Sequence, residues 1–328
     1  MKKICILTQP LHTNYGGLLQ TYALQTVLKR MGHEVWTEDR KWKRPLIVKL
    51  KQWIARLIKY KGLYYKQEQI IAQKTIPFIH KYISTTEPIY SNTKKEFNKY
   101  HFDVYIVGSD QVWRPIYSYC LSNYFLDFTV GQQVKRIAYA ASFGTSDWEF
   151  TEEQTRKCAA LAKQFDKISV REDSGVMLCK KYLGVDAIHL LDPTMLLNKE
   201  DYIRLVEQEK TPTFREKLMT YVLDQSKEKQ AIVRKVSQTL GLSPNPVMPD
   251  MNFSQVGKKY INQCVFPPVT DWLRGFMDSE FVVTDSFHGT VFSILFNKPF
   301  IVMANSERGT ARLTSLLKKF ELEERWVH

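Results

Sequence analysis

Residues Phe281–Phe296 read FVVTDSFHGTVFSILF, a polar turn inside an otherwise apolar run. Phe281–Val283 is typical of a buried strand and Val291–Phe296 of a buried helix. The turn between them holds four residues that could serve a site: Asp285, Ser286, His288 and Gly289. Buried polar groups are costly without partners, and open α/β sheets bind ligands at the carboxyl ends of their strands. The segment therefore predicts a parallel sheet with a ligand site at this turn.

Strand-like apolar runs alternate with helical patterns over the rest of the chain. Helices are expected over Leu18–Met31 and Lys227–Leu240. The other expected strands are Ile4–Thr8, Glu34–Thr37, Asp103–Gly108, Arg136–Ser142, Lys167–Arg171, Ala187–Leu191, Leu218–Leu223 and Phe300–Met303. This alternation predicts an α/β fold of two Rossmann-like lobes with parallel sheets, residues 1–193 and 194–328.

The composition is that of an ordinary globular protein with an excess of positive charge. The 328 residues are 44% hydrophobic and 25% charged, with a formal net charge of +13. This excess favours anionic partners such as phosphates, acidic sugars, nucleic acid or an anionic membrane. The five cysteines are scattered singly, so neither a zinc cage nor a disulfide framework is indicated, and we expect no metal. A short apolar start and the absence of an apolar run of about 18 residues favour a cytoplasmic location.

A strongly basic insertion, about residues 41–90, interrupts the first lobe. Residues 40–61 hold nine Lys or Arg and no acid, and apolar residues fall at helical spacing over 46–58. This pattern is typical of a basic amphipathic helix. It fits either a helix packed on its own lobe with a solvated rim or peripheral contact with an anionic membrane. Nucleic acid is not expected as a partner, because the basic run carries an aliphatic stripe and lacks a stacking platform.

Two further polar turns follow expected strands of the first lobe. In TQPLHTNYGGLLQ, Gly16 and Gly17 let a ligand approach the backbone closely, and the helix start offers free N–H groups for an anion. The alternative is a tight turn in which Asn14 caps the helix. In VGSDQVW, Ser109 and Asp110 can cap the following segment or hydrogen-bond sugar hydroxyls. We treat all five as candidate substrate-binding residues.

Arg171 stands where an expected strand gives way to a helix. A guanidinium at a strand end is a ready ligand for a carboxylate or phosphate, because its fork binds two oxygens at once. The alternative is a salt bridge to a nearby acid: Glu172, Asp173 or Asp192.

His288 is the main candidate for proton transfer. Asp285, three residues earlier, is expected to orient the imidazole or keep it protonated, so that His288 can donate a proton. Ser286 and Gly289 would bind substrate at the helix start. The alternative is an ordinary buried histidine with satisfied hydrogen bonds.

An ordered set of motifs resembles the polysaccharide pyruvyl transferase family. The stretches are NYGGLLQTYAL (14–24), GSDQVW (108–113), YFLDF (124–128), AYAASFG (138–144), SVRED (169–173), LLDPTMLL (190–197) and TDSFHGTVFSILFNKPFI (284–301). The resemblance implies a GT-B-like fold with the active site in the cleft between two lobes. It also implies transfer of pyruvate from phosphoenolpyruvate onto two hydroxyls of a sugar as a cyclic ketal, with phosphoenolpyruvate as donor substrate and no separate cofactor.

The implied chemistry needs an acid, a base and cations that hold the carboxylate and phosphate of phosphoenolpyruvate. By the resemblance, His288 is the leading acid and Arg171 the leading cation. Some family members carry arginine two positions before this histidine, where this chain has Ser286. A second cation is therefore expected from elsewhere. Arg308 and Arg312 are the candidates, although both could instead form salt bridges on a surface helix.

The expected acceptor is a sugar of an exopolysaccharide or capsule repeat unit, carried on a lipid at the inner face of the membrane. Two other functions also fit the sequence. A GT-B-type glycosyltransferase would use the same lobes but needs a nucleoside pocket for its nucleotide sugar. A non-catalytic scaffold on an anionic membrane surface would account for the basic insertion without turnover.

Overall fold

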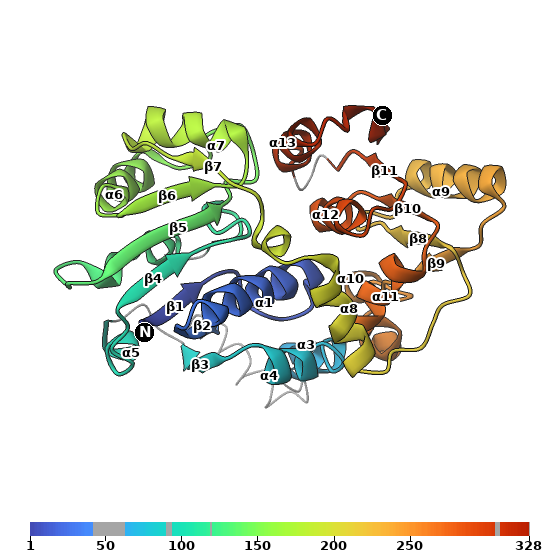
Figure 1. The fold of residues 1–328 in the computed structure, drawn as a ribbon, viewed down its shortest axis with the longest axis horizontal. Coiled ribbons are helices and arrows are strands. Elements are labelled where there is room, and N and C mark those ends of the chain that lie inside the picture. Colours follow the sequence, from blue (N-terminus) through green and yellow to red (C-terminus); the bar gives the residue numbers. More distant parts are fainter. Residues whose placement is uncertain (42–62, 90–93, 119, 306–308, 328) are drawn as a thin grey trace, which may run out of the picture.

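The computed structural model describes residues 1–41, 63–89, 94–118, 120–305 and 309–327. These residues form two β-sheets covered by helices, which Figure 1 shows as two halves joined by a yellow segment. The strand pairs of both sheets are parallel. The predicted α/β fold of two parallel-sheet lobes is therefore confirmed.

The first sheet has seven strands in the order β3-β2-β1-β4-β5-β6-β7. Its strands are β1 (Lys3–Leu7), β2 (Glu34–Arg40), β3 (Thr85–Ile89), β4 (Val104–Val107), β5 (Lys135–Ala141), β6 (Lys167–Val170) and β7 (Ile188–His189). The strand order reverses between β1 and β4, which is the point where open α/β sheets form a crevice. The polar turns that begin at Thr8 and Gly108 leave the sheet on either side of that point.

The second sheet has five strands in the order β12-β11-β10-β8-β9. They are β8 (Leu218–Tyr221), β9 (Pro244–Pro246), β10 (Phe281–Thr284), β11 (Phe300–Met303) and β12 (Trp326–Val327). Here the order reverses between β8 and β10, and the turn Asp285–His288 leaves the carboxyl end of β10. Each sheet thus carries predicted site residues at its own reversal point.

Helices cover both sheets and connect successive strands. The first lobe has α1 (Tyr15–Arg30), α3 (Leu63–Ile71), α4 (Ile76–Tyr82), α5 (Lys94–Asn98), α6 (Glu152–Ala162) and α7 (Asp173–Leu178). The later part has α8 (Lys199–Gln208), α9 (Lys227–Leu240), α10 (Phe253–Val256), α11 (Val269–Asp278), α12 (Phe287–Leu295) and α13 (Ala311–Lys319). Short 3₁₀ and π turns, such as Pro193–Leu196, complete the connections.

Two helices begin earlier than their apolar patterns predict. Helix α1 starts at Tyr15 because the side chain of Asn14 accepts a hydrogen bond from the N–H of Gly17. Helix α12 starts at Phe287, before the expected start at Gly289, because Ser286 is extended and caps it. The expected polar turn is therefore shorter, and His288 lies in the first turn of the helix.

The lobes share a core. Tyr15 of α1 stacks on Trp272 of α11 with 5.6 Å between ring centroids, and its hydroxyl donates to the carbonyl of Pro267 at 2.9 Å. Arg30 forms a salt bridge of 2.6 Å with Asp201 of α8. Helix α1 is thus fixed against the second lobe. We keep the boundary after residue 193 as a proposal, since the segment that follows packs on both lobes.

The structure describes part of the insertion at about residues 41–90. Helices α3 and α4 follow the basic segment, and β3 pairs with β2 at the edge of the first sheet, a strand that the sequence did not predict. The predicted basic helix over 46–58 lies outside the described residues. No helix in the described part of the chain combines the length and apolarity needed to cross a bilayer.

Candidate functional site

One carboxylate, that of Asp192, lies between the predicted acid His288 and the predicted substrate-binding cation Arg171. Its Oδ2 lies 2.7 Å from Nη1 of Arg171 and 3.4 Å from Nε2 of His288, the latter an ion-pair contact without hydrogen-bond alignment. Its Oδ1 accepts hydrogen bonds from the N–H and the hydroxyl of Thr194, at 3.0 and 2.8 Å. A residue of the connecting segment therefore brings Arg171 of one lobe beside His288 of the other.

Two arginines lie against one aromatic ring in this interlobe site. The guanidinium carbon of Arg171 lies 4.6 Å from the ring centroid of Phe287, and that of Arg312 lies 5.7 Å from it. Both arginines are buried, at 2% and 7% exposure. Because Arg312 belongs to α13 and Arg171 follows β6, each lobe contributes one guanidinium to the site.

The start of α1 closes the site on the side of the first lobe. A Cβ atom at Gly16 would lie 1.9 Å from Nδ1 of His288, so only glycine fits there with the imidazole in place. The predicted close approach at Gly16 is thus made to a side chain of the same protein.

Asn14 and Asp110 link the two polar turns of the first lobe. Nδ2 of Asn14 donates to Oδ2 of Asp110 at 3.1 Å, while its Oδ1 caps α1 through Gly17. Oδ1 of Asp110 lies 3.5 Å from Nη2 of Arg171. The hydroxyl of Ser109 lies 2.9 Å from the carbonyl of Ala140 and 3.2 Å from Oδ2 of Asp192. These candidates gather around Arg171, and Asn14 is also a helix cap.

The cationic side chains of the site keep its two carboxylates ionised. Burial alone would raise the pKa of Asp192, but His288 and then Arg171 stabilise the carboxylate and hold its pKa well below its usual range. Burial likewise opposes ionisation of Asp110, and Arg171, His288 and Arg312 outweigh it, so the pKa of Asp110 is lowered. Both carboxylates are therefore ionised at neutral pH.

The site stabilises the charged form of Arg312 less than that of Arg171. Burial and then the charge of Arg171 lower the pKa of Arg312 to about 10, and Asp110 is the first group that opposes this. By contrast, Asp192 and Asp110 more than compensate the burial of Arg171, so that its pKa is raised. An added anion would relieve the unfavourable charge of Arg312.

The expectation that Asp285 orients His288 is not what the contacts show. Oδ2 of Asp285 accepts from Nζ of Lys229 at 2.7 Å and from Nδ2 of Asn305 at 3.0 Å. Its two oxygens also accept from the backbone N–H groups of Leu223 and Asp224. Asp285 therefore ties the ends of β8 and β11 to the turn, and the carboxylate beside the imidazole is Asp192.

Ser286 and Gly289 have local roles in the turn. The hydroxyl of Ser286 caps α12 by accepting from the N–H of Gly289 at 3.4 Å. A Cβ atom at Gly289 would lie 2.2 Å from Oγ1 of Thr284, so the helix can approach the strand only with glycine there. Their binding of substrate stays a prediction, since these contacts explain both residues without a ligand.

Of the two arginines predicted as a second cation, the structure describes one. Arg308 lies outside the described residues, whereas Arg312 is buried in the site. Sequence reasoning missed Phe287, on which both guanidinium groups lie. It named Asp192 only as a salt-bridge alternative for Arg171. The available signal was that Asp192 directly follows the expected strand Ala187–Leu191.

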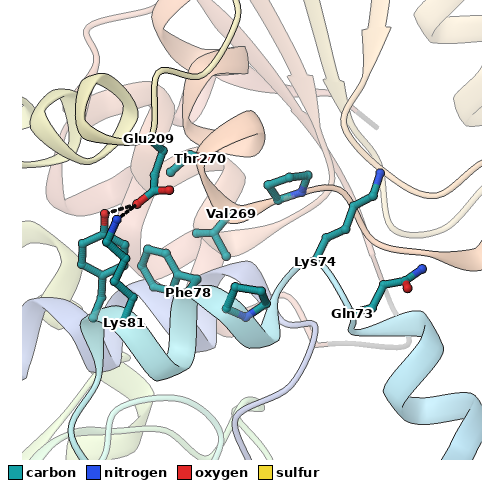
Figure 2. Close-up of a pocket in the computed structure, with 10 residues that line it drawn as sticks. Gln73, Lys74, Phe78, Lys81, Glu209, Val269 and Thr270 are labelled. Atoms are coloured by element: carbon teal, nitrogen blue, oxygen red, sulfur yellow. Dashed lines mark hydrogen bonds and ion pairs between the residues drawn. The ribbon is translucent and has the colours of Figure 1, made fainter.

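A separate pocket of about 330 Å³ is lined by other residues than the catalytic candidates. Figure 2 shows it between α4 and the start of α11, with Phe78, Val269 and Thr270 among its lining residues. Nζ of Lys81 lies 2.5 Å from Oε1 of Glu209 at one end, so that charge is already paired. The pocket holds neither His288 nor Arg171.

The interlobe site has the groups that acid-catalysed addition to an anion requires. Two guanidinium groups can bind oxyanions, an imidazole can transfer a proton, and two ionised carboxylates can orient these groups. No group of three or more His, Cys, Asp or Glu placed to hold a metal ion occurs in the described part of the chain.

The chain is similar to solved two-lobed proteins. One, from Listeria monocytogenes and assigned as a UDP-N-acetylglucosamine 2-epimerase, has 12% identity and a TM-score of 0.50, over 99% of this chain and 89% of that one. Another, an α-glucosyltransferase solved with UDP and a 13-mer DNA containing an HMU base, has 11% identity and a TM-score of 0.51, over 99% and 88%. At this identity the likeness concerns the fold, which is GT-B-like as predicted. No curated protein matches the chain.

A family model named for polysaccharide pyruvyl transferase matches residues 14–307. The matched region includes Gly16, Asp110, Arg171, Asp192 and His288, which meet between the lobes. The ordered motifs, the two-lobed fold and the match agree: the chain belongs to the polysaccharide pyruvyl transferase family, whose members are transferases.

Proposed function

We propose that the protein transfers pyruvate from phosphoenolpyruvate to two hydroxyls of one sugar, forming a cyclic ketal and releasing phosphate. The observation that carries the proposal is the meeting of Arg171 and His288 at Oδ2 of Asp192, with Arg312 on the same phenylalanine ring as Arg171. An acid and two cations between the lobes are what a small anionic enol ester requires.

Each group has a chemical role in this proposal. Arg171 and Arg312 bind the carboxylate and phosphate of the donor, and the longer contact of Arg171, 3.5 Å to Asp110, is the one that the donor replaces. His288 donates a proton to the methylene carbon, which becomes a methyl group and leaves C2 electrophilic. Asp192 stays with His288 and positions it.

The bonds then change in two steps. A sugar hydroxyl adds to C2 and passes its proton to the deprotonated His288. The bond from C2 to the phosphate oxygen breaks, and phosphate leaves with the electron pair. A second hydroxyl of the same sugar then adds to C2, its proton goes to the phosphate, and the ring closes. The overall change is donor plus diol to ketal plus phosphate, without oxidant or reductant.

The acceptor in this proposal is a sugar of an exopolysaccharide or capsule repeat unit carried on a lipid. The basic amphipathic pattern at 46–58 of the sequence supports contact with the anionic surface where such carriers lie.

Incubation with labelled phosphoenolpyruvate and a glycolipid extract from the host tests the function. Label should enter the lipid fraction while phosphate is released. His288→Ala should abolish both without unfolding the protein. Arg171→Ala should weaken donor binding and also lower Tm, because it removes the guanidinium that pairs with buried Asp192 and Asp110. Turnover of His288→Ala at the rate of the natural protein would remove this residue from the mechanism.

A further inference from the structure

An exposed aromatic side chain lies on the turn that also carries Asp110. Tyr117 is 38% exposed and its neighbour Ile116 is 73% exposed. In the described part of the chain, Tyr117 and Tyr260 are the two aromatic residues among the exposed large apolar side chains. An exposed aromatic ring next to a site is informative, because the other Phe, Tyr and Trp rings among the side chains that the structure describes, apart from Tyr260, are buried or half-buried.

The ring of Tyr117 is backed by a fixed guanidinium. The guanidinium carbon of Arg114 lies 5.3 Å from the ring centroid of Tyr117. Nε and Nη2 of Arg114 bind both carboxylate oxygens of Glu149, at 3.0 and 3.1 Å, and Nη1 donates to Oε1 of Gln111 at 3.3 Å. A two-pronged pair of this kind has little freedom, so it holds the ring in a defined orientation.

Arg114, which lies against the ring of Tyr117, is at the contact between the lobes. A Cβ atom at Gly309 of the second lobe would lie 2.1 Å from the carbonyl oxygen of Gly144 and 3.9 Å from Nη1 of Arg114. The same turn carries Asp110, whose Oδ1 lies 3.5 Å from Nη2 of Arg171. The exposed ring thus belongs to the turn that contacts an arginine that we assign to the donor.

We propose that Tyr117 is the stacking platform of the acceptor sugar, with the exposed carboxylate of Glu149 as a hydrogen-bond partner for the hydroxyls of the sugar. The assignment rests on the proposed function, because it takes the neighbouring site to hold the donor. A tyrosine ring offers a flat apolar face to the C–H groups of a pyranose, and the polar groups around it fix the orientation of the sugar.

Ketal formation makes such a platform useful. Two hydroxyls of one sugar must reach the same carbon in succession, so the sugar must stay in one orientation between the two additions. A flat ring backed by an immobile guanidinium restrains the sugar face while allowing the small shift that the second addition needs.

Saturation-transfer NMR in the absence of phosphoenolpyruvate tests the platform. The ligands are the methyl glycosides of glucose, galactose, mannose and N-acetylglucosamine. At least one glycoside should receive saturation, most strongly at its ring C–H protons. The signal should fall about fivefold or more in Tyr117→Ala and persist in Tyr117→Trp. The matched controls are Ile116→Ala, at an exposed neighbour, and Tyr260→Ala, at a tyrosine of the second lobe with similar exposure (43%).

A thermal shift with phosphoenolpyruvate in the same variants separates this inference from the proposed function. Tyr117→Ala should keep the shift of the natural protein. Equal saturation in Tyr117→Ala and the natural protein, or no saturation of any glycoside, overturns the platform even where phosphoenolpyruvate still stabilises the protein. Tyr117-dependent saturation without stabilisation by phosphoenolpyruvate supports the sugar site and counts against the donor.

Discussion

The imidazole of His288 lies against the backbone of Gly16 so closely that a methyl group there would be 1.9 Å from Nδ1. The two residues are on different lobes, so the contact fixes both the ring and the approach of α1 to α12. Gly16→Ala should displace the ring and lower turnover about 100-fold or more, since misplacement of about 1 Å at a catalytic group has this effect.

A double-mutant cycle checks that the loss comes from this contact. Gly16→Ala should also lower Tm, and adding His288→Ala should restore much of that loss because the colliding ring is gone. Additive losses of stability in the double variant would show that the methyl group acts elsewhere.

Asp192 should stabilise the fold in a pH-dependent way. Its pKa is held below the usual range in the folded protein, so its contribution is present above the unfolded pKa of about 4 and is lost as pH falls further. Asp192→Asn should cost about 3–5 kcal/mol at pH 7, because it removes the closer of the two buried carboxylates that pair with Arg171. Denaturant unfolding from pH 7 to pH 3 should show the gap between natural protein and variant narrowing below about pH 4. A gap that widens toward pH 3 would contradict this account.

Asp285 should prove structural. Asp285→Ala removes the closer of the two carboxylates paired with buried Lys229, and the acceptor of two backbone N–H groups. It should lower the free energy of unfolding by about 3–5 kcal/mol. At a temperature where the variant remains folded, the pH profile of phosphate release should keep its shape. An unchanged Tm together with lost turnover would show that Asp285 takes part in catalysis.

Arg312 should bind phosphoenolpyruvate, while its buried charge lowers the stability of the fold. Burial first, and then Arg171, lower its pKa to about 10, so the charged form is disfavoured by folding throughout the range below that pH. Arg312→Met should therefore leave Tm at pH 7 unchanged or raise it, while phosphoenolpyruvate affinity falls about tenfold or more. A large loss of Tm with retained affinity would make Arg312 a structural residue.

The sequence predicted the sheets well because their strands are short apolar runs next to polar turns. Phe300–Met303 was predicted with the observed bounds. Strands β3, β9 and β12 were missed, since Thr85–Ile89 and Pro244–Pro246 contain prolines and polar residues, and Trp326–Val327 is only two residues long. Edge strands gain their pairing from neighbours, which an apolar pattern does not record.

The sequence predicted which turns form the site, but it predicted less well which side chains contact one another there. His288 and Arg171 were placed in one site, and the structure brings them together. The carboxylate beside His288 was assigned to Asp285 because it is near in sequence. The first turn of α12 instead directs the ring toward Asp192, which is distant in sequence and reaches the site through the connecting segment. Contacts between lobes depend on tertiary packing, which local spacing does not encode.

Isothermal titration calorimetry with phosphoenolpyruvate, and with UDP as comparison, tests the central claim most directly. We predict that one phosphoenolpyruvate binds per chain, that binding is lost or greatly weakened in Arg171→Met and Arg312→Met, and that UDP gives no comparable heat. Binding of UDP at one site per chain, with no heat from phosphoenolpyruvate, would contradict the account.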